Sequence, residues 1–79
     1  MGRSVDDLPS LGPPGGFLVK KSEAGEVIQR RTFDADGRAA KDIDFDHDYE
    51  GVGRPHAHDW DWSKRRVRQR ARPLGPGEV

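Results

Sequence analysis

Residues 34–37, with the sequence Asp-Ala-Asp-Gly, restrict the fold of this chain more than any other segment, because they separate two segments of alternating polarity. An Asp-Gly pair adopts left-handed backbone conformations at little cost and is typical of a tight β-hairpin. The segment 27–33 precedes this turn, and a segment from about residue 38 to residue 46 follows it. We therefore predict two antiparallel strands that are joined at this turn.

Two further segments extend this hairpin. Residues 17–22 place Phe17 and Val19 on one face of a first strand, and the turn at residues 23–25 contains a glycine that accepts positive φ. Residues 56–62 could form a short fourth strand. The predicted fold class is mainly β, or a small α+β fold, built as an antiparallel β-meander of three to four strands.

The ends of the chain lack such patterns. Residues 1–16 hold three prolines and four glycines and are predicted to be a linker or an extended arm. Residues 63–72 offer only two apolar side chains for a helical stripe, so we predict a frayed helix or an extended basic tail. Residues 73–79 are predicted to be a flexible C-terminus. The small domain itself then covers residues 17–72.

The loop length of the central hairpin determines how its strands align. A two-residue loop would place Arg31 opposite Asp42 and Ile28 opposite Phe45, and both cross-strand pairs would be favourable. A three-residue loop with a glycine bulge would instead place Arg30 opposite Asp42. In both cases an arginine of the second strand meets a carboxylate of the third.

The small apolar content limits the core. Only 32% of the 79 residues are hydrophobic, and cysteine is absent. A chain this short and polar buries little apolar surface, so we expect a compact sheet or a bound partner protein to stabilise it. No run is apolar enough for a membrane span or a signal peptide. If the domain acts outside its parent cell, we therefore expect that another protein carries it there.

All three histidines lie within twelve positions, at His47, His56 and His58. On a strand, His56 and His58 project to the same side about 6.5 Å apart. This spacing suits a general base and a general acid acting on one phosphodiester, or joint coordination of a metal. In RNA, one ring would activate the 2′-hydroxyl and the other would protonate the leaving 5′-oxygen, with no metal required. The alternative is that these histidines are solvated residues of a polar loop.

The carboxylates Asp42, Asp44 and Asp46 alternate along one face of the predicted third strand. Together with histidine, such oxygens could hold Mg²⁺, Mn²⁺ or Zn²⁺ in a metal-dependent nuclease. The alternative is a solvated outer face that arginines balance. The spacing matches neither a calcium loop nor a His-Asn-His nuclease motif, so the leading prediction includes no metal and no cofactor.

The basic residues could bind phosphate. Arg54 lies beside the histidines and is the best candidate, because a guanidinium group binds phosphate in a bidentate fork. Residues 64–72 carry six basic side chains and no acid, which favours either salt-dependent binding of nucleic acid or a disordered, solubilising end. Trp60 could stack on a base, although in so small a domain it could equally supply core.

Three parts of the chain resemble a known family: residues 33–45 (Phe-Asp-Ala-Asp-Gly-Arg-Ala-Ala-Lys-Asp-Ile-Asp-Phe), His47, and residues 54–60 (Arg-Pro-His-Ala-His-Asp-Trp). They are similar to the C-terminal toxin domains of bacterial polymorphic toxins, the group labelled polymorphic toxin type 24, over about residues 30–62. The resemblance implies a secreted or contact-delivered fragment that attacks nucleic acid, above all RNA, in the cytoplasm of a target cell. It also implies a cognate immunity protein.

The chain is also similar to the wider barnase, EndoU, colicin and RelE-like ribonucleases, which use a small antiparallel sheet and His, Arg and Lys side chains without a metal. Those folds normally pack an N-terminal helix on the sheet, and this sequence shows no clear helix there. Despite this difference, the motifs and the histidine pair make a metal-independent ribonuclease toxin domain the leading interpretation. Its alternatives are a metal-dependent nuclease that uses the Asp and His side chains, and a non-enzymatic β-module that binds nucleic acid or a protein.

The predicted site has two parts. The predicted catalytic residues are His47, His56, His58, Lys41, Asp42 and Asp44. The predicted substrate- or phosphate-binding residues are Arg30, Arg31, Arg54 and Trp60.

Overall fold

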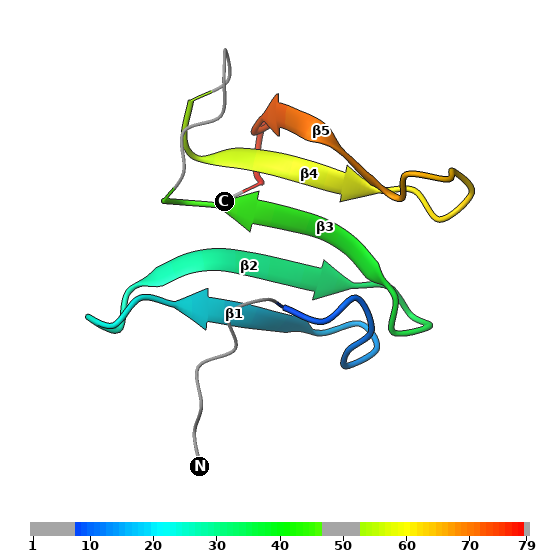
Figure 1. Cartoon of the computed structure of the whole chain (residues 1–79), viewed down its shortest axis with the longest axis horizontal. Helices are drawn as coiled ribbons and strands as arrows, with labels where there is room; N and C mark the ends of the chain where they lie inside the picture. The colour runs from blue at the N-terminus through cyan, green and yellow to red at the C-terminus, as the bar shows by residue number, and fades with distance from the viewer. Residues whose placement is uncertain (1–7, 47–52, 79) are drawn as a thin grey trace.

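The computed structural model describes residues 8–46 and 53–78, and every regular element in these two ranges is a β-strand. The strands are β1 (Phe17–Lys21), β2 (Val27–Phe33), β3 (Ala39–Asp44), β4 (His56–Trp60) and β5 (Arg68–Pro73). They form one antiparallel sheet in the order β1-β2-β3-β4-β5, which Figure 1 shows as a single twisted layer. Within these ranges the chain has no helix that could cross a membrane.

The antiparallel meander predicted from the sequence is confirmed, but the predicted count of three to four strands is too low. The sequence predicts a frayed helix or a basic tail for residues 63–72, whereas residues 68–73 form the strand β5. This strand pairs with β4, where Ala71 lies opposite His58 and Arg72 lies opposite Ala57. The pairing satisfies the backbone groups along one side of β4, which would otherwise be an open sheet edge.

Strands β2 and β3 pair in the register that places Arg31 opposite Asp42. The turn that joins them is longer than the two-residue loop, because Asp34 N donates to Arg38 O and three residues lie between these two. One extra residue in β3, Ala40, then lies next to the turn and restores the alignment. The predicted arginine–carboxylate pair therefore forms through a three-residue loop and a bulge together.

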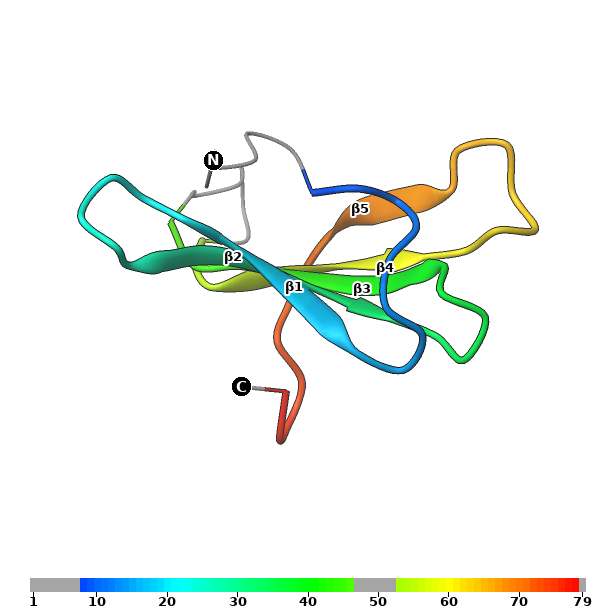
Figure 2. The same ribbon diagram turned by 90° about the horizontal axis from the view of Figure 1, so that it is seen from below.

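The two faces of the sheet carry different side chains, because successive residues of a strand point to opposite sides. We call one side the site face, and it carries Asp42, Asp44, His56 and His58. We call the other side the back face, and it carries Lys41, Ile43, Ala57 and Asp59. Figure 2 shows that the segment before β1 and the segment after β5 lie on opposite sides of the sheet.

The described part of the N-terminal arm, residues 8–16, is bound to the sheet. Leu8 is buried, and its carbonyl oxygen accepts a hydrogen bond from the guanidinium group of Arg31. The carbonyl oxygen of Ser10 accepts a hydrogen bond from the backbone N–H of Ala39. This part of the chain is therefore an attached, extended arm.

Residues 73–78, which belong to the segment predicted to be a flexible C-terminus, fold against the back face. The carboxylate of Glu78 accepts two hydrogen bonds from Arg72, each 2.7 Å long. The ammonium group of Lys41 lies 3.1 Å from the same carboxylate. Arg72 in turn binds Asp59 of β4 at 2.6 Å. This ionic network fixes the C-terminal segment to β3, β4 and β5.

Glu78→Gln is expected to lower the melting temperature at pH 7, and this loss is expected to shrink in acid. Hydrogen bonds from Arg72, Gly75 N–H and Lys41 hold the pKa of Glu78 well below its usual value of 4.5. A carboxylate with a lowered pKa stabilises the folded state above its unfolded-state pKa, and this contribution falls as the pH drops toward the folded-state pKa. Melting temperatures of both proteins from about pH 7 to about pH 2.5 test this. An equal difference at both ends would contradict an ionic role for Glu78.

Gly37→Ala is expected to cost about 1–3 kcal/mol of stability and to cost more than Gly25→Ala. Both glycines have positive φ, 81° at Gly37 and 86° at Gly25, which strains any L side chain. A Cβ atom at Gly37 would also lie 2.8 Å from the carbonyl oxygen of Gly12, whereas a Cβ atom at Gly25 meets nothing within 4 Å. Urea unfolding of the two variants measures the difference. Equal costs would show that the N-terminal arm does not press on this turn.

Candidate functional site

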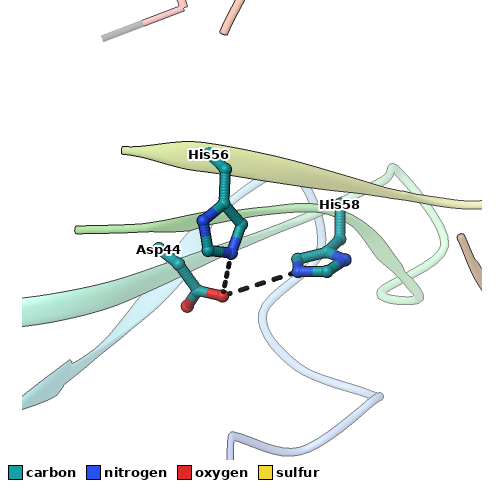
Figure 3. Close-up of side chains that lie close together, drawn as sticks. All are labelled: Asp44, His56 and His58. Carbon is teal, nitrogen blue, oxygen red and sulfur yellow. Dashed lines mark hydrogen bonds and ion pairs between the residues drawn. The ribbon is translucent and has the colours of Figure 1, made fainter. Parts of the chain in front are cut away.

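The pairing of β3 with β4 brings one carboxylate and two histidines together on the site face. His56 lies opposite Asp44, and the alternation along β4 places His58 on the same side. The exposed fraction is 7% for Asp44, 1% for His56 and 4% for His58. Figure 3 shows both rings directed toward the Asp44 carboxylate. We call these three residues the Asp-His-His cluster.

Hydrogen bonds orient both rings of the cluster. Nε2 of His56 lies 3.1 Å and Nε2 of His58 lies 3.6 Å from Oδ2 of Asp44. Nδ1 of His56 lies 2.9 Å from the carbonyl oxygen of Gly53, and Nδ1 of His58 lies 2.9 Å from that of Gln69. Because a carbonyl oxygen only accepts, each Nδ1 carries a proton and donates it. In the neutral form of each ring, Nε2 therefore directs a lone pair toward Asp44.

The environment of His58 favours its neutral form. Burial has the largest effect and lowers the pKa of His58, while the hydrogen bond to Gln69 opposes this only in part. The positive charge of Arg68 lowers the pKa further. At pH 7 the ring is therefore neutral, with its proton on Nδ1. Its Nε2 can accept a proton or bind a metal.

A second buried network lies beside the cluster. Asp42 is fully buried and accepts hydrogen bonds from Arg31 at 2.6 and 2.9 Å and from Arg68 at 2.8 Å. Burial acts to raise the pKa of Asp42, but the hydrogen bonds from the two arginines outweigh it and hold the pKa below its usual value. Nη2 of Arg68 also lies 3.6 Å from Oδ2 of Asp44. Arg68 therefore connects this network to the Asp-His-His cluster.

A small basic pocket includes one residue of the cluster. Its volume is about 170 Å³, and it is lined by His58, Arg66, Arg68, Gln69 and Arg70. We call it the arginine pocket. A wider hollow of about 640 Å³ shares three of these residues and is lined by Lys64, Arg66, Gln69, Arg70, Ala71 and Arg72. Only the smaller pocket reaches the cluster, so it is the more relevant of the two for chemistry.

The structure brings some of the predicted site residues together and separates others. Asp42, Asp44, His56, His58 and Arg31 all lie on the site face. Lys41 and Arg30 lie on the back face, where both contact Glu78. Arg54 is exposed and donates a hydrogen bond to the carbonyl oxygen of Asp46. His47 lies outside the described residues.

The Trp60 ring packs against neighbouring side chains of the sheet. Its ring centroid lies 4.7 Å from the guanidinium carbon of Arg31 and 5.8 Å from the ring of Trp62. Trp62 is held in turn by a hydrogen bond from its Nε1 to the carbonyl oxygen of Ala39. These contacts favour the packing role of Trp60 over base stacking.

From the sequence, the arginines of the pocket are predicted only as parts of a basic tail. The signal that could have identified them is their spacing, because arginine occupies every second position from Arg66 to Arg72. A period of two is typical of a strand with distinct faces, not of a helix.

No family model, no curated protein and no solved structure matches this chain. The similarity to polymorphic toxin type 24 domains therefore rests on the sequence motifs alone and stays a prediction.

Proposed function

We propose that this domain cleaves RNA and forms the C-terminal toxin part of a larger bacterial protein that is delivered into a target cell. The observation that carries the proposal is the arginine pocket, in which His58 meets three guanidinium side chains. Phosphodiester cleavage needs a group that accepts a proton and cations that bind the phosphate, and this pocket offers both. The delivery and a cognate immunity protein are proposed from the sequence resemblance.

The proposed reaction uses the nucleophile that RNA itself carries. The 2′-hydroxyl attacks the adjacent phosphorus, and the bond from phosphorus to the 5′-oxygen breaks. The 2′-hydroxyl loses a proton and the 5′-oxygen gains one, which leaves a 2′,3′-cyclic phosphate and a 5′-hydroxyl. We assign the metal-free Asp-His-His cluster to proton removal, and we assign Arg66, Arg68 and Arg70 to the charge on the phosphate. DNA lacks the 2′-hydroxyl and would not react in this way.

The burial of the cluster bears on the roles of the two histidines. Direct proton exchange with RNA requires that a ring reach the substrate; both rings are buried, and His56 does not line the arginine pocket. His58 lines the arginine pocket and is the residue that we assign to the RNA side of the cluster. We assign His56 to positioning Asp44, because the doubly protonated ring can donate from Nε2 to Oδ2 of Asp44, which lies 3.1 Å away.

The purified 79-residue chain is expected to degrade RNA and to leave plasmid DNA intact. Each substrate would be incubated with Zn²⁺, with Mg²⁺ and with EDTA, and mass spectrometry would identify the RNA ends as cyclic phosphates. The double variant Arg66→Gln/Arg70→Gln retains the cluster and removes two pocket cations. We expect this variant to raise KM and to weaken the salt dependence of RNA binding.

Several outcomes would count against the proposal. Intact RNA in all three conditions, with a chain whose circular dichroism shows a folded sheet, would refute RNA cleavage. Binding of RNA without cleavage would instead support the non-enzymatic module. An unchanged KM in the double variant would show that RNA does not use the arginine pocket.

A further inference from the structure

The Asp-His-His cluster directs three potential ligand side chains toward one another on the site face of the sheet (Figure 3). Each histidine donates from Nδ1 to a backbone carbonyl, so Nε2 of each neutral ring and Oδ2 of Asp44 all present lone pairs. These ligand atoms lie within 4.8 Å of one another, and all three residues are buried. Histidines that bind metals show the same pattern, because their second ring nitrogen usually donates to a carbonyl or a carboxylate.

The spacing of the three atoms fits a transition-metal ion. Zinc lies about 2.0–2.2 Å from imidazole nitrogen and carboxylate oxygen, so two ligand atoms of a tetrahedral zinc ion are roughly 3.3–3.5 Å apart. The two histidine nitrogens lie 3.1 and 3.6 Å from Oδ2 of Asp44, and the two nitrogens lie within 4.8 Å of each other. Small adjustments of the side chains would therefore place all three atoms around one ion.

We propose that Asp44, His56 and His58 bind one divalent transition-metal ion, with zinc as the best match. Two imidazoles and one carboxylate suit zinc and its neighbours in the first row, whereas Mg²⁺ and Ca²⁺ prefer oxygen ligands alone. Among residues 8–46 and 53–78, this cluster supplies three ligands, and a tetrahedral ion with three protein ligands has a fourth position for water, a substrate oxygen or another side chain. Because His58 also lines the arginine pocket, an anionic ligand in that pocket would be close to this position.

The charges of Arg68 and Asp42, which lie near the cluster, affect the zinc affinity that we expect. The guanidinium group of Arg68 lies 3.6 Å from Oδ2 of Asp44 and opposes a cation there. Asp42 compensates part of this charge, because it binds Arg68 at 2.8 Å. We therefore expect weaker zinc binding than in a closed structural site with four protein ligands.

Zinc binding would be measured on the 79-residue chain after treatment with a chelator, by competition with a chromophoric zinc indicator. We expect one zinc ion per chain and a higher melting temperature with zinc, because a ligand of the folded state stabilises that state. Millimolar Mg²⁺ is expected to give no such shift. Asp44→Asn and His58→Gln are expected to weaken zinc binding at least about tenfold. The matched control Asp36→Asn removes an exposed carboxylate outside the cluster and is expected to bind zinc like the parent chain.

Absence of zinc binding by the parent chain, or equal binding by the cluster variants and the control, would overturn the site. If the cluster variants unfold, nitrogen NMR of the histidine rings in the parent chain gives an independent test. Zinc is expected to shift Nε2 of His56 and His58 and to leave each Nδ1 protonated, whereas unchanged Nε2 signals would overturn the proposal. No RNA is present in these measurements, so they are independent of the test of RNA cleavage.

Discussion

Asp42→Asn is expected to destabilise the fold by about 3–5 kcal/mol, because it removes the negative partner of two buried or half-buried guanidinium groups. Asp42 is fully buried, and its carboxylate accepts hydrogen bonds from both Arg31 and Arg68. An asparagine side chain has nearly the same shape but no charge, so Arg31 would stay buried without its counter-ion. Small domains are stable by only about 5–15 kcal/mol, and this one has a small core. If the parent stability is near the lower end of this range, a substantial fraction of the molecules would unfold at 37 °C.

Denaturation with urea, followed by circular dichroism, would measure this loss. The matched control is Asp36→Asn, which removes the carboxylate of an exposed ion pair with Arg38 and is expected to cost at most about 1 kcal/mol. Similar midpoints for Asp42→Asn and Asp36→Asn would show that the buried arginine network does not stabilise the sheet.

His58→Gln is expected to lower the rate of RNA cleavage by about 10²–10⁴-fold while the sheet stays folded. His58 is the residue that the Asp-His-His cluster and the arginine pocket share. Glutamine fills much of the same space and can donate to the carbonyl oxygen of Gln69, but it lacks the imidazole lone pair that faces Asp44. Initial rates on a short RNA, with enzyme in excess, would measure this effect.

The matched control for the rate is Lys21→Gln, which changes an exposed residue of β1, four strands away from β5. We expect its cleavage rate to stay within about threefold of the parent rate, because surface substitutions far from a site are usually neutral. Comparable activity of His58→Gln and Lys21→Gln would remove His58 from the reacting centre. Circular dichroism of both variants separates a loss of activity from a loss of folding.

The first four strands could be predicted from the sequence because their side chains alternate and because strong turn residues separate them. The pairing of Arg31 with Asp42 followed from the Asp-Gly turn, although the turn is one residue longer than the loop that gave this alignment. The bulge at Ala40 compensates for the extra residue. Neither the extra loop residue nor the bulge has a clear signal in the sequence. The predicted register is correct because these two deviations from a two-residue hairpin cancel.

The prediction for residues 63–72 does not include the strand β5, because it rests on the lack of an apolar helical stripe. The feature of this segment that indicates a strand is arginine at every second position. A bulge also changes which arginines reach the site face. His58 pairs with Ala71 and Trp60 pairs with Arg68, so two residues of β5 lie opposite Asp59. This shift directs Arg68 toward Asp42, while Arg72 binds Asp59 on the back face. The sequence contains no residue that marks the position of this bulge.

The assignment of Lys41 to the same site as Asp42 conflicts with the geometry of a strand. Neighbouring residues of a strand point to opposite faces, so the sequence alone could have placed Lys41 on the side of Ile43. The structure does so, and Lys41 binds Glu78 there. The convergence of His56 and His58 on Asp44 could be predicted only in part, because it depends on the register between β3 and β4.

Nuclear magnetic resonance with an RNA that cannot be cleaved tests the central claim most directly, because both faces of the sheet carry arginines. An RNA oligonucleotide with 2′-methoxy groups lacks the nucleophile and would bind without reacting. We predict that RNA binding causes the largest chemical-shift changes at His58, Arg66, Arg68 and Arg70. The chemical shifts of Lys41 and Glu78 are expected to change little. Shifts that map to Lys41, Arg30 and Arg72 on the back face, with His58 unchanged, would contradict a reacting centre at the Asp-His-His cluster.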